Sequence, residues 1–170
     1  GSHNQFTGIF PAEISRFMPS LQYISLVNNS FSGQVPDSIG NMTDLRRIYI
    51  QQNSFSGSLS SSFGNLLNLQ VLQIEENHLT SSIPSSFGNL NKFQRLRLNN
   101  NNMTGSIPNS LSKLGRLQQL YLQSNRLTSS LPEGFANMTG LLFAHISDNS
   151  LTGSLPAMLG KLQQLIFLNV

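Results

Sequence analysis

The chain has 170 residues, of which 38% are hydrophobic and only 10% charged, and its formal net charge is +3. This length suits one domain, and so small and scattered a charge gives no reason to expect a nucleic-acid partner. The absence of Cys excludes thiol catalysis, Zn–thiolate sites and iron–sulfur clusters, and no apolar run approaches the roughly 18 residues of a membrane span. We expect residues 1–3, Gly-Ser-His, to be an expression-tag remnant.

Residues 4–170 repeat with a period of 24 residues. There are about seven units, of which six whole ones keep this register without an insertion and the first is one residue longer, which predicts a solenoid of stacked coils. We expect the chain to be truncated inside a repeat at both ends, without caps, so that its uncapped ends self-associate. The most regular position of the repeat is an Asn, at Asn29, Asn53, Asn77, Asn101, Asn125 and Asn149.

Each unit is expected to begin with a short strand. The alternation Leu-x-Leu, as at Leu72 and Ile74, has a period of two, which buries these residues and turns the intervening ones outward. The recurring Asn follows, and we expect its amide to bond backbone groups of its own and the neighbouring coil, as a structural ladder. A Pro such as Pro84 then marks a turn, before a single helical turn. The sequence thus predicts an α/β repeat solenoid, a right-handed curved coil with one parallel concave sheet and an irregular, 3-10 convex side.

The segment after the ladder Asn carries a specific motif. It reads Phe-Ser-Gly-Gln-Val-Pro over residues 31–36 and Leu-Thr-Gly-Ser-Leu-Pro over residues 151–156. In this motif the chain resembles the plant-specific leucine-rich repeat proteins, over residues 4–170, and most of all receptor-like kinase ectodomains such as those of subfamily VIII. It departs from the family in lacking Cys-bearing caps, in Ser81 and Ser129 for the motif Gly, and in Ser60 for the motif Pro. We expect these Ser residues to relax local turns without changing the coil.

The resemblance implies a ligand-binding, protein-interaction module of an extracellular receptor kinase or receptor-like protein at the plasma membrane. The implied partners are a peptide or protein ligand and a co-receptor, with no nucleic acid and no direct membrane contact. A soluble inhibitor of the polygalacturonase-inhibitor type is the alternative, and an ice-binding leucine-rich repeat protein is a more remote one. No enzyme activity, cofactor or metal is expected, because no catalytic motif is present and any kinase activity would lie in a domain outside this chain.

Outward strand residues are expected to form columns across the coils. Tyr, Arg, Phe and His gather in the first two columns, and these types are enriched in binding hot spots. Arg side chains also suit a carboxylate, such as a peptide C-terminus or an acidic sugar. The alternative is that these side chains merely cover the sheet, with Arg97 paired to Glu75. The predicted ligand-binding residues are Arg47, Tyr49, Arg95, Arg97, Tyr121, Phe143 and His145.

Four Asn-x-Ser/Thr sequons occur, about as many as this composition gives by chance. Asn41 and Asn137 share one repeat position, in the turn away from the strands, and are the expected glycosylation sites. Asn28 and Asn102 are less favoured, because they flank the exposed strand face, where glycans would obstruct a ligand.

Overall fold

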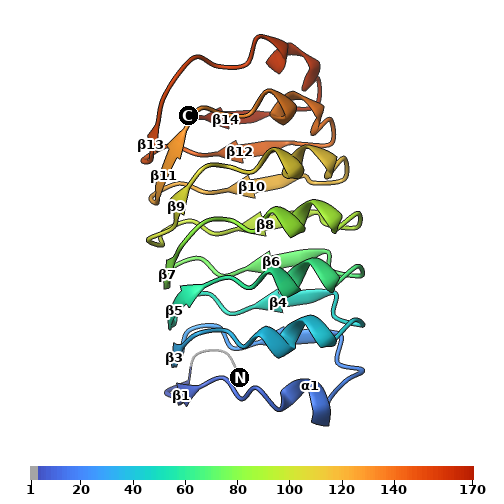
Figure 1. Ribbon diagram of the computed structural model, residues 1–170, viewed down its shortest axis with the longest axis vertical. Coiled ribbons are helices and arrows are strands. Elements are labelled where there is room, and N and C mark those ends of the chain that lie inside the picture. The colour runs from blue at the N-terminus through green and yellow to red at the C-terminus, as the bar shows by residue number, and fades with distance from the viewer. Residues whose placement is uncertain (1–3) are drawn as a thin grey trace.

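A computed structural model describes residues 4–170, and the expected tag remnant, residues 1–3, lies outside them. The described chain coils into a solenoid that adds one strand per turn to a seven-stranded parallel sheet (Figure 1). We call this sheet the concave sheet. Its strands are β2 (Tyr23–Ser25), β4 (Arg47–Tyr49), β6 (Val71–Gln73), β8 (Arg95–Arg97), β10 (Gln119–Tyr121), β12 (Phe143–His145) and β14 (Phe167–Asn169).

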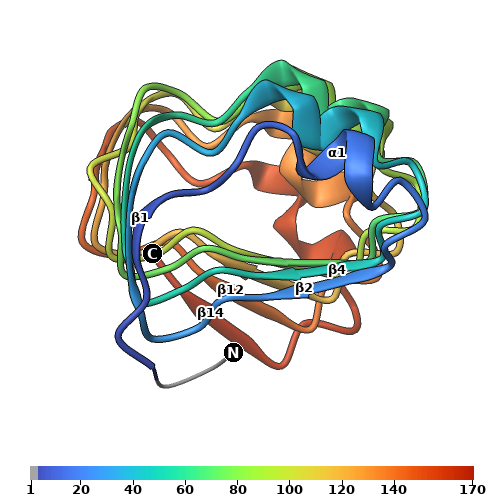
Figure 2. The ribbon, with the colours of Figure 1, turned by 90° about the horizontal axis from the view of Figure 1, so that it is seen from below.

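A second set of strands lies at the side of the coil, between the concave sheet and the helical turns (Figure 2). We expected one sheet only, whereas these strands form two further parallel sheets, of order β1-β3-β5-β7 and β13-β11-β9. They arise because the motif after the ladder Asn also alternates, burying Phe55 and Leu79 while Thr80 stays exposed. The strands are β1 (Thr7–Ile9), β3 (Ser30–Gly33), β5 (Ser54–Ser58), β7 (His78–Thr80), β9 (Thr104–Gly105), β11 (Arg126–Ser129) and β13 (Ser150–Leu151).

The third side of each coil is a short helical turn, as expected. In four of these turns a Ser hydroxyl bonds the preceding coil, as where Ser86 Oγ donates to the Ser61 carbonyl at 2.7 Å. Gly64 permits this approach, because a Cβ there would lie 2.5 Å from Ser86 Cβ. The elements are the helix α1 (Ile14–Phe17) and the 3-10 helices η1 (Asp37–Asn41), η2 (Ser61–Asn65), η3 (Ser85–Asn89), η4 (Asn109–Lys113), η5 (Glu133–Asn137) and η6 (Ala157–Lys161).

One continuous apolar core runs through the stack. Leu72, Leu96 and Leu120 are fully buried, which confirms the predicted inward face of the strands. Phe63 in η2 and Phe87 in η3 pack with ring centroids 6.0 Å apart. Consecutive coils therefore bury one another, as a solenoid requires.

The Asn ladder is confirmed as structural. Asn77 Oδ1 accepts a hydrogen bond from the Phe55 backbone N–H at 2.9 Å. Its Nδ2 donates to the carbonyls of Ile50, Ile74 and Glu75 at 3.1–3.2 Å. The amide thus joins its own coil to the preceding one, and Asn101 and Asn125 bond in the same pattern.

The motif substitutions behave differently from our expectation. Ser81 and Ser129 do not relax their turns: they keep positive φ values of 64° and 69°, close to the 75° of Gly105. Each therefore holds a left-handed conformation that costs an L-residue roughly 1 kcal/mol. Ser60 keeps the extended conformation found at Pro36 and caps η2 by accepting a hydrogen bond from the Ser62 N–H.

Apolar side chains remain exposed at both ends of the stack. Phe17 is 72% exposed in the first coil, and Ile166 is 72% exposed in the last. Self-association through these ends stays a prediction. Within residues 4–170 the structure contains no helix with the length and hydropathy to cross a bilayer.

The ladder generates a stability prediction. Asn77→Ala removes the amide and leaves the Phe55 N–H without a partner inside the core, while the Ile50 carbonyl keeps only its bond from Asn53 Nδ2. We expect a loss of about 3 kcal/mol in the free energy of unfolding, measured by urea denaturation. Asn109→Ala, at an exposed position of η4, is the control and should change stability by less than about 0.5 kcal/mol. Equal effects of the two substitutions would contradict a structural role for the ladder.

Candidate ligand-binding site

The structure places all seven predicted ligand-binding residues on the outer face of the concave sheet. The strands pair in register at 24-residue spacing, so that Arg47 lies beside Val71, and Gln73 beside Arg97. The first column reads Tyr23, Arg47, Val71, Arg95, Gln119, Phe143 and Phe167, and the second reads Ser25, Tyr49, Gln73, Arg97, Tyr121, His145 and Asn169.

The predicted residues form two groups instead of one continuous patch. Strand β6 separates the groups, because its outward residues Val71 and Gln73 are only 5% and 8% exposed. Glu75, which continues the same line, is also 8% exposed. The face therefore has a strip of buried side chains along residues 71–75, which we call the trough. Arg47 and Tyr49 lie on one side of it, and the other five predicted residues lie on the other.

The C-terminal group is a row of stacked side chains, which we call the aromatic row. The guanidinium of Arg97 lies 4.7 Å from the Tyr121 ring centroid, within the range of a cation–π interaction. The Tyr121 and His145 rings pack edge to face at 6.2 Å, and His145 and Phe167 do so at 5.7 Å. Each half-exposed side chain of the row thus has its orientation supported by the next.

Hydrogen bonds further restrict this row. Arg97 Nη2 donates to Gln119 Oε1 at 3.0 Å. The His145 Nε2 atom lies 2.9 Å from Asn169 Nδ2 and 3.0 Å from Ser147 Oγ. Phe167 and Asn169 were missed by the sequence analysis, although the 24-residue spacing leads directly to them from Phe143 and His145.

The N-terminal group borders a shallow hollow of about 260 Å³, lined by Gln22, Tyr23, Arg46, Arg47 and Gln70. The Tyr23 and Tyr49 rings pack beside it at 5.4 Å. Two guanidinium groups and no carboxylate line this hollow, which therefore suits an anion. Arg46 was missed because it precedes the strand and lies outside the predicted columns.

The trough holds the carboxylate of Glu75, one oxygen of which has no hydrogen-bond partner. Glu75 Oε2 is buried and has no hydrogen-bond partner, so the alternative in which Arg97 pairs with Glu75 is not found. Burial raises the pKa of the Glu75 carboxyl above its usual value of 4.5, and a backbone hydrogen bond and the Arg97 charge offset this only in part. The charged form is thus disfavoured in the free protein.

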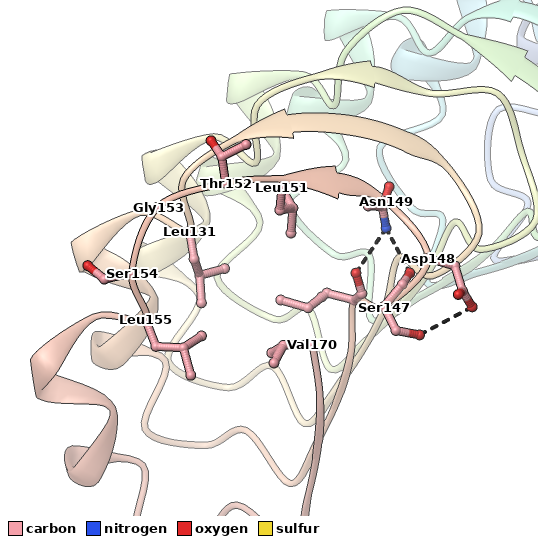
Figure 3. A pocket seen from close by; sticks show the side chains of 11 residues that line it. Leu131, Ser147, Asp148, Asn149, Leu151, Thr152, Gly153, Ser154, Leu155 and Val170 are labelled. Atoms are coloured by element: carbon pink, nitrogen blue, oxygen red, sulfur yellow. Dashed lines mark hydrogen bonds between the residues drawn. The ribbon is translucent and has the colours of Figure 1, made fainter.

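A larger hollow lies elsewhere, at the C-terminal end of the stack, and has a volume of about 400 Å³. Leu131, Leu151, Leu155 and Val170 surround it, between the concave sheet and the side strands (Figure 3). It is the open face of the core, where in other coils the next coil packs. We therefore assign it to coil packing and not to the ligand-binding face.

Two of the four sequons lie in helical turns, away from the concave sheet. Asn41 and Asn137 are exposed at the ends of η1 and η5, as expected, while Asn28 is exposed and Asn102 is half-buried. Among residues 4–170, no three His, Asp or Glu side chains gather in a group that could hold a metal ion.

The leucine rich repeat family matches the chain at residues 20–42, 44–66 and 67–127. No curated protein sequence matches it. Solved structures share this fold, and two plant receptor kinase ectodomains among them have TM-scores above 0.9.

The ectodomain of the Arabidopsis thaliana receptor kinase GASSHO1/SCHENGEN3, solved with CASPARIAN STRIP INTEGRITY FACTOR 2, is 32% identical with a TM-score of 0.96. The match covers 98% of this chain and 20% of that one. The Arabidopsis HAESA ectodomain, solved with an IDA peptide hormone ligand, is 32% identical with a TM-score of 0.91, over 96% of this chain and 27% of that one. A plant ice-binding protein is 28% identical with a TM-score of 0.73, and the match covers 83% of this chain and 44% of that one. The chain thus spans about a fifth to a quarter of the two receptor ectodomains.

The buried carboxylate generates a pH prediction. Because the folded state raises the Glu75 pKa, wild-type stability falls as pH rises from about 4.5 through the folded pKa, and the loss is complete above it. Glu75→Gln lacks this titration and should be more stable than wild type at pH 7, by on the order of 1 kcal/mol. The gain should disappear below about pH 4.5, as measured by urea unfolding across pH. The exposed neighbour Glu76→Gln is the matched control, and a gain from Glu75→Gln that does not vary with pH would contradict the assignment.

Proposed function

Since the chain belongs to the leucine-rich repeat family, we propose that it is a ligand-binding segment of an extracellular receptor ectodomain. Its ligand is a peptide that lies across the concave sheet. The observation that carries the proposal is the aromatic row, where Arg97, Tyr121, His145 and Phe167 form one supported, half-exposed surface. Such side chains give much contact area, and little ordering entropy is lost when they are already held in place.

The dimensions of the face suit a short extended peptide. From Tyr49 on β4 to His145 on β12 there are four strand steps, or roughly 19 Å at about 4.8 Å each. An extended chain covers this distance in about six residues. The ligand would cross the trough and contact both groups of predicted residues.

The arginines of the concave face differ in how readily they can bind a carboxylate of such a peptide. Arg97 is already engaged by Gln119 and Tyr121. Arg46 and Arg47, in contrast, line a hollow without an acidic neighbour. We therefore assign an acidic group of the ligand to the N-terminal hollow, with Arg95 as the second choice.

Similarity to receptor ectodomains supports a peptide ligand and a location outside the cell. The two HAESA structures contain an IDA peptide hormone, one of them with the co-receptor SERK1, and the GASSHO1/SCHENGEN3 structure contains CASPARIAN STRIP INTEGRITY FACTOR 2. We extend to this chain the peptide ligand and a co-receptor as proposed partners, and we assign it no catalytic role.

An enzyme inhibitor and an ice-binding protein are the two alternative functions, and each predicts a different binding result. An inhibitor would bind a folded enzyme such as a polygalacturonase instead of short peptides. An ice-binding protein would need a regular face, whereas the columns of the concave sheet mix Arg, Tyr, Val, Gln and His. The experiment below therefore includes a purified polygalacturonase as a second analyte.

The binding prediction uses a library of random hexapeptides with free C-termini. Peptides selected on the wild-type chain should bind Arg97→Ala or Tyr121→Ala more weakly by about 1–3 kcal/mol, measured by calorimetry, while the unfolding midpoint changes little. Asn109→Ala, on the opposite side of the coil, should bind as wild type does. Affinity lost only through substitutions on the helical side would show that the concave face is not the site. Binding to the polygalacturonase alone would favour the inhibitor.

The proposed extracellular location predicts glycans on the helical side. When the chain is secreted from a plant or insect cell line, Asn41→Gln and Asn137→Gln should each remove the mass of one N-glycan in intact-mass spectrometry. Asn102→Gln, at a half-buried sequon, should leave the glycan mass unchanged. Glycans found on Asn102 but not on Asn41 or Asn137 would overturn this assignment.

A further inference from the structure

The charges along the two edges of the concave sheet are segregated by sign. The first residue of each strand and the three residues before it form what we call the entry edge, and the three residues after each strand form the exit edge. Within residues 4–170, the exit edge contains Glu75, Glu76 and Asp148 and no basic residue. The entry edge contains one acidic residue, Asp44. Its basic residues are Arg46, Arg47, Lys92, Arg95 and Arg116. An anionic ligand is therefore attracted to the entry edge and not to the exit edge.

Backbone hydrogen bonds hold the entry edge in one register. The Gln22 carbonyl accepts a bond from the Arg46 N–H at 2.9 Å, and the Arg46 carbonyl accepts one from the Gln70 N–H at 2.8 Å. The same bond joins Gln70 to Gln94, and Gln94 to Gln118, at 2.8 Å. Basic and amide side chains from successive coils thus lie side by side and form one polar surface.

Three arginines of the entry edge are available to a ligand. Among residues 4–170, none forms a hydrogen bond or an ion pair with the guanidinium groups of Arg46, Arg47 or Arg95. The Arg97 guanidinium, in contrast, donates to Gln119. Arg46 and Arg47 are exposed and line the N-terminal hollow, and Arg95 is half-buried. All three side chains are therefore in contact with solvent, from which an anion can reach them.

The positions of these arginines set the spacing of the anions that they can bind. From Arg47 on β4 to Arg95 on β8 there are two strand steps, or about 9.6 Å at about 4.8 Å each. Val71 lies between them in the same column, and it is apolar and only 5% exposed. The entry edge thus offers two separate positions for anions, one in the hollow and one at Arg95.

The geometry of a peptide matches this distance at one separation of its residues. In the polyproline II conformation, which has three residues per turn and a rise of about 3.1 Å, side chains three positions apart lie on one side, about 9.3 Å from each other. In a fully extended strand, side chains on one side are two or four positions apart, or about 6.6 Å and 13 Å. The distance of about 9.6 Å therefore agrees best with acidic residues at positions i and i+3.

We infer that the peptide ligand carries two carboxylates three residues apart, one bound in the hollow by Arg46 and Arg47 and one bound by Arg95. A guanidinium group bonds a carboxylate through parallel N–H donors. Gln22 and Gln70, which also line the hollow, supply further amide donors. Arg95 thus binds a second carboxylate, in addition to the one already assigned to the hollow.

The inference rests on the proposed function, because it specifies the charge pattern of the peptide that the concave sheet binds. It also places the parts of that peptide. The acidic part lies over β4 to β8, along the entry edge, and the part that follows lies over the aromatic row, which begins at Arg97 and continues to Tyr121 and His145.

The first test compares three random hexapeptide libraries with capped ends, in which acidic residues are fixed at positions 1 and 3, 1 and 4, or 1 and 5. We expect the immobilised wild-type chain to retain the library with positions 1 and 4 at least about fivefold better than the other two. Arg47→Gln and Arg95→Gln should each abolish this preference. Arg126→Gln, on the side strand β11, removes the same charge at an exposed position and should keep it. Equal retention of the libraries, or equal effects of the three substitutions, would overturn the inference.

The second test identifies which arginine binds which carboxylate. One peptide from the library with positions 1 and 4 is titrated by calorimetry, intact or with either acidic residue replaced by its amide. Each replacement should weaken binding to wild type about fivefold, but should have little effect on the variant that lacks the matching arginine, Arg47→Gln or Arg95→Gln. Coupling of both arginines to the same carboxylate would contradict the proposed arrangement.

Three further outcomes separate this inference from the proposed function. If peptides without acidic residues bind equally well and depend on Tyr121, the acidic pattern is wrong while the peptide site stands. If an oligogalacturonide binds in a manner that depends on Arg47 and the acidic peptides do not bind, the entry edge is a polysaccharide site and the inference is wrong. If no library binds better to wild type than to a variant with Arg97→Ala and Tyr121→Ala, the proposed function itself fails.

Discussion

The stacking of consecutive coils in this protein depends on the bonds of the Asn ladder. Each ladder amide bonds backbone groups of its own coil and of the preceding coil, as Asn77 does with Ile74, Ile50 and Phe55. These bonds hold consecutive coils in one register with no slip. Because a slip of one residue would turn the buried Leu of a strand outward, the same register also keeps the core closed. The outer columns of the concave sheet are a consequence of this constraint.

Because the register is fixed, residues at one repeat position form a column across the concave sheet, and the side chains in a column can differ from strand to strand. Neighbouring strands are about 4.8 Å apart, so side chains 24 residues apart can stack, as Tyr121 and His145 do. Variation at a single repeat position then appears as a change along the face. The buried side chains of β6 form the trough, and Arg and aromatic residues lie on either side of it. The rigid frame leaves recognition to these few variable positions.

Polar groups are hydrogen-bonded in one part of the fold and partly unbonded in another. The bonded groups have a structural role, whereas the unbonded ones lie on the proposed binding face. On the helical side and along the ladder, hydroxyl and amide groups bond neighbouring coils, as Ser86 and Asn77 show. On the concave face, four buried atoms remain without partners. The strain at Ser81 and Ser129 differs in kind, because it lies in the backbone at the side of the coil and faces no recognition column. The hydrogen bonds at the repeated positions thus stabilise the fold, whereas the unbonded buried atoms at the variable positions of the concave face reduce its stability.

The amino-acid sequence by itself determined the period of 24 residues, the buried Leu positions, the ladder and the side on which Arg97 and Tyr121 lie. It could do so because these properties depend on local alternation and on a repeat that each coil copies. Only the tertiary structure decided that the motif after the ladder Asn pairs into further sheets, that Arg97 turns to Gln119 and not to Glu75, and that β6 divides the binding face. These outcomes depend on side chains from three or more coils meeting in space. No single repeat contains that information, because burial and hydrogen bonding are settled between neighbours.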